Sequence, residues 1–339
     1  MTADEVLEVI DGGLLTSVQD LGRPGWAGSG VPHGGACDPW SLAVANIGCG
    51  NLPDAPALEL TLVPPTLRLL RATTLGFAGA DLGLRLQRAG TDRPFLPGSA
   101  IHVAEGDILV PGSPSGTGAR AYLAVAGGID VPRVLGSAST ALGAGFGGID
   151  GRALRAGDRL AAAPPLAGAR HAAPHTVPPV VERTTDPATP LLVLPGPFSG
   201  RPGDAELRRA FLAATWRVGA ASDRMGLRLD GPPLEPADTT DIPSHGVTWG
   251  TIQLPPDGRP IVLLADHQPT GGYPVLAVVI AAERPRLGQL RPGAEVRFEE
   301  TTRSTAIEAL RAQQTRLAAL VAAAGDARRW DDAVDSAGG

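Results

Sequence analysis

The sequence predicts a mainly β protein of two lobes, with a few short helices and one helix near the C-terminus. Its 339 residues include 45 glycines and 33 prolines, which weaken helix interiors and favour turns. Candidate strands recur about every 8–12 residues with turn residues between them, which is typical of a β-barrel or sandwich. The length fits two domains of ordinary size.

The first lobe is predicted to span residues 1–165. It begins with a strand at 6–10, which is followed by a Gly- and Pro-rich loop at 17–39. A short helix is predicted at 40–48, because Asp38 suits the N-cap and Pro39 the first helical position. Further strands are expected at 57–63, 66–72, 74–79, 83–89, 99–110 and 119–128.

Residues 166–190 are rich in Ala and Pro and are expected to form a linker. The second lobe, 191–303, is predicted to contain a helix at 204–214 and strands at 191–197, 215–219, 251–255, 260–266, 275–282 and 294–300.

A helix is expected at 304–324, with Ser304 as its cap, and packing is its expected role. One face of that helix collects Ile307, Leu310, Leu317, Leu320 and Val321. Residues 325–339 are expected to be disordered.

Composition excludes several classes of function. The net charge of −6 gives no basic field for nucleic acid. The longest apolar run, Val275–Ala282, is too short to span a membrane, and the acidic N-terminus is unlike a signal peptide. We therefore expect a cytoplasmic protein.

Cys37 and Cys49 lack metal-ligand spacing and are expected to be small buried residues rather than a disulfide.

The chain contains no lysine, so all of its 29 basic residues are arginine. It therefore cannot form a Schiff base, supply a P-loop lysine or carry biotin on a lysine. Any anion that it binds must be held by arginine, by backbone N–H groups or by a metal. No histidine pattern typical of a metal site is present, and no GxSxG or strand-to-helix GxGxxG motif appears.

Polar residues interrupt the apolar pattern at three places. The first cluster contains Gln19, Asp20 and Arg23, and Asp38 and Asn46 follow it. An Asp20–Arg23 ion pair that fixes a loop is as plausible as substrate binding, and Asp38 fits a helix cap better than a catalytic acid. The second cluster consists of Ser222, Asp223 and Arg224. Since Asp223 and Arg224 are adjacent, they cannot face the same way on a strand.

The third cluster is the best-marked candidate site. The apolar run at 260–264 predicts a buried strand that delivers Asp266 to a polar loop. Gly271 and Gly272 would let the backbone approach a ligand and form an anion nest. The alternative is a hairpin loop whose polar side chains bond their own backbone. The cluster comprises Gln253, Asp266, His267, Gln268, Thr270 and Tyr273.

These motifs resemble the carboxyltransferase A/B family, also called allophanate hydrolase subunit 2. The resemblance covers roughly residues 12–300, including SVQDLGRPGW, SDRMGLRLDGPPL and PIVLLADHQPTGGYP. The family includes the C component of ATP-dependent 5-oxoprolinase, an antagonist of a histidine-kinase inhibitor, and part of the carboxyltransferase domain of urea carboxylase.

The resemblance implies paired cyclophilin-like β-barrels. It also implies a complex with two further components, A and B, of which B belongs to the kinase-inhibitor family. ATP is implied as co-substrate, and biotin only if another protein carries it.

This sequence departs from the family pattern at five positions, namely Gly34, Cys37, His245, Pro269 and Glu283. The positions that match it are Gln19, Asp20, Gly22, Arg23, Asp38, Asn46, Ser222, Asp223, Arg224, Gln253, Asp266, Gln268, Thr270, Gly271, Gly272 and Tyr273.

The first hypothesis is one component of an enzyme that opens the 5-oxoproline lactam. Arg23 or Arg224 would clamp a carboxylate or phosphate, and Gln253 would polarise a lactam oxygen together with the Gly271–Gly272 backbone. Asp266 would orient a neighbour or accept a proton, and Tyr273 would support the developing oxyanion. Three alternatives remain: a biotin-dependent carboxyltransferase component, a regulatory module that binds a kinase-inhibitor homologue, and, with least support, a prolyl isomerase.

Overall fold

The computed structural model describes residues 5–165, 189–196, 204–235 and 243–337, and it confirms a mainly β fold with a few short helices and a C-terminal helix. The chain divides into two compact units. Unit 1 comprises residues 1–22, 38–181 and 314–339, and unit 2 comprises residues 23–37 and 182–313. Most of the predicted linker, 166–188, lies outside the described residues. Assignment of residues 23–37 to unit 2 differs from the predicted division, because sequence pattern does not record long-range contacts.

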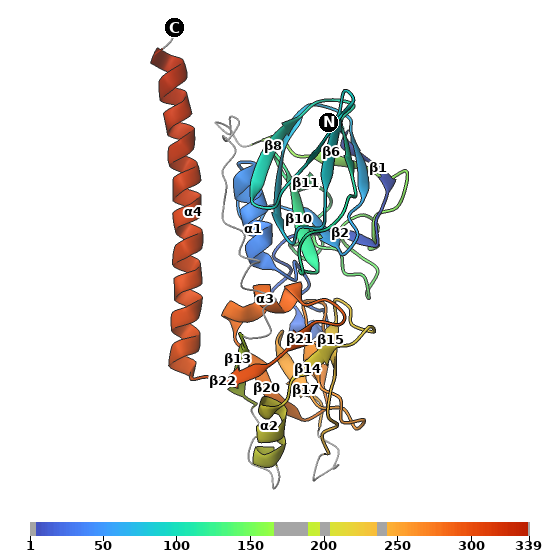
Figure 1. Cartoon of the computed structure of the whole chain (residues 1–339), viewed down its shortest axis with the longest axis vertical. Helices are drawn as coiled ribbons and strands as arrows, with labels where there is room; N and C mark the ends of the chain where they lie inside the picture. Colours follow the sequence, from blue (N-terminus) through green and yellow to red (C-terminus); the bar gives the residue numbers. More distant parts are fainter. Residues whose placement is uncertain (1–4, 166–188, 197–203, 236–242, 338–339) are drawn as a thin grey trace. The chain divides into compact units, whose positions relative to one another are not determined.

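Two sheets form unit 1 (Figure 1). The order of the first is β11 (Ile129–Asp130), β12 (Arg159–Ala162), β1 (Glu5–Asp11), β4 (Thr66–Leu69), β9 (Ile108–Val110), β6 (Arg85–Arg88) and β7 (Thr91–Pro94). The order of the second is β2 (Leu15–Gln19), β3 (Ala57–Thr61), β10 (Arg120–Val125), β5 (Thr73–Gly79) and β8 (Ser99–Val103). The predicted strand at 99–110 is two strands, β8 and β9, because Gly106 adopts a positive φ of 84° between them.

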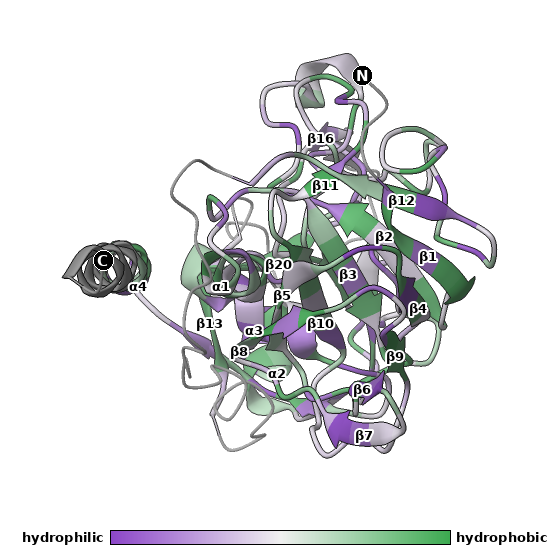
Figure 2. Cartoon of the chain, turned by 90° about the horizontal axis from the view of Figure 1, so that it is seen from above, coloured by the Kyte–Doolittle hydropathy of each residue, from purple (hydrophilic) through white to green (hydrophobic). Residues whose placement is uncertain are grey.

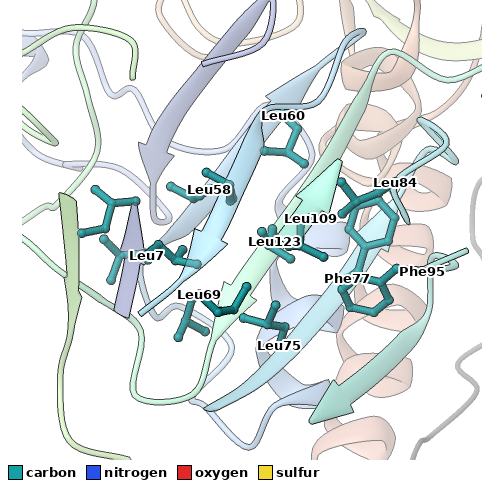
Figure 3. Close-up of a cluster of buried hydrophobic side chains, with 14 of the residues drawn as sticks. Leu7, Leu58, Leu60, Leu69, Leu75, Phe77, Leu84, Phe95, Leu109 and Leu123 are labelled. Carbon is teal, nitrogen blue, oxygen red and sulfur yellow. The ribbon is translucent and has the colours of Figure 1, made fainter. Parts of the chain in front are cut away.

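Apolar side chains from both sheets meet in one core (Figure 3). Side chains alternate along each strand, so β4 places Leu67 and Leu69 inside and Arg68 outside. The rings of Phe77 and Phe95 lie 5.2 Å apart within this core. At the end of the first sheet, β7 is exposed at all four positions and is largely hydrophilic (Figure 2), as expected of an edge strand that must not pair with another chain.

Helix α1 (Pro39–Gly48) covers β5 and β10. Its predicted cap is confirmed, since the Asp38 carboxylate accepts from the Ser41 N–H at 2.9 Å. Every residue of β5 and β10 is buried, because the core packs on one face of these strands and α1 on the other. A Cβ added at Gly76 would lie 2.0 Å from the Ala45 carbonyl oxygen. Glycine at 76 therefore allows helix and strand to touch.

Unit 2 contains a nearly closed barrel. Its sheet has the order β21 (Glu295–Val296), β14 (Trp216–Val218), β15 (Gly226–Asp230), β18 (Ile261–Leu263), β17 (Thr251–Gln253), β20 (Val275–Val279), β13 (Leu191–Pro195) and β22 (Phe298–Glu300). Although β21 and β22 stand at opposite ends of this order, only Arg297 separates them in the chain. The sheet consequently curls round on itself. A two-stranded sheet joins β16 (His245–Gly246) to β19 (Thr270–Gly271).

The core of unit 2 is built around aromatic rings. Phe211 of α2 (Asp204–Ala213) stacks on Trp216 at 5.5 Å and on Phe298 at 4.8 Å between ring centroids. Cys37 is part of this core. Both cysteines are buried thiols, as predicted, and burial raises the pKa of the Cys49 thiol to about 12. Short helices η1 (Ala27–Ser29), η3 (Ala281–Glu283) and α3 (Arg284–Gln289) complete the unit.

Helix α4 runs from Arg303 to Ala337 and is thus longer than the helix predicted at 304–324. Residues 325–337 contain three Ala and two Arg, which favour a helix, together with four Asp. Ser304 lies inside the helix, and Thr302 serves instead as a cap by accepting from the Thr305 N–H at 3.2 Å. No helix in the described part of the chain is both long and apolar enough to cross a membrane.

Candidate functional site

A buried ion pair joins the second and third polar clusters within unit 2. Arg224 lies just before β15, and Asp266 follows β18. These two strands pair with each other. The guanidinium of Arg224 donates to both oxygens of Asp266, from Nε at 2.8 Å and from Nη2 at 3.0 Å. The two residues are 3% and 8% exposed, so bulk water does not screen the pair. Such a pair fixes geometry and is costly to break.

The loop at 23–37 docks on this pair. Arg224 Nη2 also donates to the Gly35 carbonyl at 2.6 Å, and the Gly34 N–H donates to the Ala265 carbonyl at 3.0 Å. Gly34 has a φ of +65°, and a Cβ there would lie 3.0 Å from Arg23 Nη1 and 3.8 Å from Asp266 Oδ1. Glycine at this position thus leaves space for the buried guanidinium of Arg23.

Arg224 therefore has a different role from the predicted carboxylate or phosphate clamp. Its guanidinium faces Asp266 and the Gly35 carbonyl and is buried from solvent. Both oxygens of Asp266 are likewise engaged by one cation. We interpret Arg224 and Asp266 as positioning residues that hold the 23–37 loop against the strand ends.

Gln253 has unused hydrogen-bonding capacity, as do some other buried groups such as Gln19 Oε1 and Trp249 Nε1. It ends β17, is 2% exposed, and its Nε2 has no hydrogen-bond partner among the described residues. A Cβ at Gly271 would lie 2.4 Å from that nitrogen. The amide of Gln253 consequently lies directly against the glycine of the third cluster, and a buried amide donor without an acceptor is a group that a ligand oxygen would stabilise.

The predicted anion nest at Gly271–Gly272 is not formed. A nest needs alternating right- and left-handed backbone, whereas neither glycine has a positive φ and Gly271 pairs with His245 in β19 and β16. Its lack of a side chain serves the close contact with Gln253 instead. Gln268 is half-buried, and Thr270 is exposed. Tyr273 is 44% exposed and makes no hydrogen bond within the described residues.

Ser222 and Asp223 form a turn. The Asp223 carboxylate accepts from the N–H groups of Met225 at 2.8 Å and Gly226 at 3.2 Å, and Ser222 Oγ accepts from the Arg228 N–H at 3.0 Å. These side chains therefore satisfy the local backbone instead of facing a ligand.

The first cluster is divided between the units, since Gln19 and Asp20 belong to unit 1 and Arg23 to unit 2. The Asp20 carboxylate accepts from Ser137 Oγ, the Ala138 N–H and Ser139 Oγ at 2.5–2.7 Å. It forms an ion pair with Arg133 at 3.6 Å, in place of the local pair considered with Arg23. Asp20 thus holds the 137–139 segment in place.

The remaining predicted residues of unit 1 are also built into the fold. Gln19 is fully buried and donates from Nε2 to Ser17 Oγ at 2.9 Å. Asn46 donates to the Ala55 carbonyl at 2.8 Å and accepts from Asn51 Nδ2 at 2.9 Å. With the capping role of Asp38, these contacts assign structural roles to Asp38 and Asn46.

A cavity of about 220 Å³ lies next to the third cluster, within unit 2. His267 and Trp249 are its buried walls, 6% and 8% exposed. The guanidinium carbon of Arg284 lies 4.9 Å from the centre of the Trp249 ring, a cation–π contact. His33 and Thr248 are exposed lining residues. Sequence reasoning missed Trp249 and Arg284, because no local signal connects residues 35 positions apart.

The positive charge of the cavity comes from Arg284, since the lowered pKa of His267 favours its neutral form. Arg284 has no carboxylate partner among the residues that the structure describes, and burial lowers the pKa of its guanidinium. Burial also lowers the pKa of His267, and the nearby His33 and Arg284 act in the same direction. A larger cavity, of about 300 Å³, lies beside Asp81 and Arg85 in unit 1 and touches none of the predicted site residues. Among the described residues, no group of three or more His, Cys, Asp or Glu is placed to hold a metal ion.

Comparison with known proteins adds three findings. A family model, the carboxyltransferase domain with subdomains A and B, matches residues 29–300. The chain is 37% identical over 309 residues to the C subunit of 5-oxoprolinase from Escherichia coli K12, across 91% of this chain and 96% of that protein. The Haemophilus influenzae protein of the same name is 33% identical over 87% of this chain and 91% of its own length.

A solved structure is similar as well. The crystal structure of the K. lactis urea amidolyase matches with a TM-score of 0.83 and 29% identity. The match covers 94% of this chain but 20% of that much longer chain.

Proposed function

Because the chain belongs to the family of carboxyltransferase subdomains A and B, we propose that it is the C component of an ATP-dependent 5-oxoprolinase. The complex would convert 5-oxo-L-proline, ATP and water to L-glutamate, ADP and phosphate. The similarity to two proteins named as the C subunit of 5-oxoprolinase, over nearly their whole lengths, supports this assignment.

The structural observation that carries the proposal is the amide of Gln253. Opening a lactam places negative charge on the carbonyl oxygen, and a preorganised N–H donor stabilises that charge most where water is excluded. Gln253 Nε2 is such a donor, since it is buried and has no partner among the described residues. In this scheme the Arg224–Asp266 pair positions the loops, and the exposed phenol of Tyr273 supports the oxyanion.

The partners follow from the same assignment. An A component and a B component of the kinase-inhibitor family would complete the enzyme. We place ATP binding on the complex rather than on this chain, which has no lysine to form a P-loop. We therefore expect this chain alone to release no glutamate.

The test uses the purified A, B and C components, singly and mixed, with 5-oxoproline and ATP. We expect glutamate and phosphate in equal amounts from the three-component mixture. Gln253→Met keeps the length of the side chain and removes the donor, and it should lower kcat by about 100-fold. Gln87→Met, at an exposed position of β6, is the matched control. A Gln253→Met mixture with full activity would refute the role of Gln253, and a mixture without turnover would refute the proposed function.

The similarity to the urea amidolyase structure favours one other candidate, a carboxyltransferase component that works on biotin carried by another protein. This alternative predicts a carboxylated product when carboxybiotin and an amide acceptor replace ATP and 5-oxoproline. If this chain instead binds a homologue of the B component tightly and no mixture turns over substrate, the regulatory role applies.

A further inference from the structure

We propose that the cavity beside the third cluster is a binding site for a small carboxylic acid that also carries an amide group, with Arg284 holding the carboxylate. The inference rests on the proposed function, where the acid would be the lactam substrate. It assigns substrate binding to Arg284 and Trp249, which lie outside the three clusters that the sequence marks, together with His267 of the third cluster.

The charge of Arg284 is the first argument. Its side chain is half-buried and stacks on Trp249, and its Nε is buried without a hydrogen-bond partner in the described part of the chain. No carboxylate among the described residues pairs with it. By contrast, Arg286 on the same helix is paired with Glu283 at 2.7 Å. A partly desolvated guanidinium without a counter-ion favours an anion, and its planar fork matches a carboxylate.

The remaining polar groups of the cavity are complementary to an amide. The indole Nε1 of Trp249 is buried, can only donate, and has no acceptor among the described residues. His267 Nδ1 lies 2.6 Å from the Gln268 carbonyl, and His33 Nδ1 lies 3.1 Å from the Gly34 carbonyl. Each contact is satisfied by a proton on Nδ1, and in that tautomer the Nε2 atom of the ring is an acceptor. The cavity thus offers an N–H for a carbonyl oxygen and ring nitrogens for an amide N–H.

The size of the cavity limits the ligand. Its volume of about 220 Å³ is smaller than the roughly 300–1,000 Å³ of pockets that hold drug-sized ligands. A nucleotide would need more phosphate contacts than the single arginine of the lining provides. A five-membered lactam with one carboxylate satisfies the guanidinium, the indole N–H and the imidazoles together.

The test measures KM for 5-oxoproline and for ATP with the three-component mixture. Arg284→Gln should raise KM for 5-oxoproline by about 10- to 100-fold, the range for a lost charge-assisted contact, and leave KM for ATP unchanged. Arg284→Lys should give an intermediate value, since it keeps the charge without the fork. Arg228→Gln, at an exposed site of the same unit, is the matched control. An unchanged KM in correctly folded Arg284→Gln, as judged by near-UV circular dichroism, would overturn the inference.

Calorimetric titration of the full chain separates this inference from the proposed function. We expect 5-oxoproline to bind more tightly than acetate, and 2-pyrrolidinone, which lacks the carboxylate, to bind least. Trp249→Phe should weaken the binding of 5-oxoproline without weakening the binding of acetate. If the mixture has no turnover but these acids bind in an Arg284-dependent way, the proposed function fails and the site remains. If no acid binds, or if Arg284→Gln binds them equally well, the site is refuted.

Discussion

Replacement of Gly271 by alanine tests the contact on which the proposed catalytic role of Gln253 depends. The added Cβ would lie 2.4 Å from Gln253 Nε2, whereas ordinary contact begins at 3.4 Å. The amide must therefore retreat by about 1 Å. Gly271 does not have a positive φ, so alanine fits the backbone there and the effect isolates the contact.

We expect Gly271→Ala to lower the free energy of unfolding by about 1–3 kcal/mol, the usual cost of overpacking a buried position. Activity of the three-component mixture should fall by about 100-fold, because a shift of about 1 Å in a positioned group has that effect. Urea unfolding monitored by circular dichroism gives the first quantity, and glutamate release gives the second.

The control lies on the neighbouring strand. A Cβ at Gly246 meets nothing within 4 Å, and Gly246 pairs with Thr270, so Gly246→Ala should be nearly neutral. On a Gln253→Ala background, Gly271→Ala should recover most of the lost stability, with a coupling of about 1 kcal/mol or more between the two sites. Additive effects of the two changes, or equal destabilisation by Gly246→Ala, would refute the contact.

Three further outcomes are expected. Asp266→Asn leaves the buried charge of Arg224 without its counter-ion and should cost about 3–5 kcal/mol in urea unfolding; a loss below about 1 kcal/mol would contradict the importance of the pair. Burial lowers the pKa of His267 in the folded chain below its usual 6.5, so its contribution to stability is complete above that pH and is lost as the pH falls below it. His267→Asn should therefore flatten the acid side of a plot of urea midpoint against pH, and identical slopes would argue against a buried neutral imidazole. Gly76→Ala places a Cβ 2.0 Å from the Ala45 carbonyl oxygen and should cost about 3 kcal/mol or more in thermal unfolding, with loss of α1 packing; an unchanged melting temperature would contradict the close contact.

Local chemistry accounts for the features that the sequence predicts well. Asp38 and Pro39 mark the start of α1 through backbone groups three residues away, and the apolar run before Asp266 marks a buried strand. The same kind of reasoning places Gln253 and Asp266 in one candidate site. Both are in unit 2, though they contact different partners.

Long-range contacts account for the features that the sequence does not predict. Asp20 and Arg23 are three residues apart, which allows a local pair, whereas the Asp20 carboxylate pairs with Arg133, 113 positions further along the chain. Arg284 begins a short helix, and nothing in the sequence distinguishes it from other helical arginines. Its cation–π contact with Trp249 is visible only in the structure. In the sequence Gly271 resembles a backbone ligand site, whereas its actual neighbour, Gln253, comes from another strand.

Unit 2 is built from two separate segments of the chain, and this arrangement sets an order for folding during synthesis. The two sheets of unit 1 are complete once Ala162 has been made, whereas the barrel of unit 2 needs β22 at Phe298–Glu300. At about 5–20 residues per second, translation of the intervening chain takes roughly 7–28 s. Until Ala265 has been made, the 23–37 loop has emerged without all of the groups that it binds. Unit 1 should thus fold while the 23–37 loop still lacks the rest of its own unit.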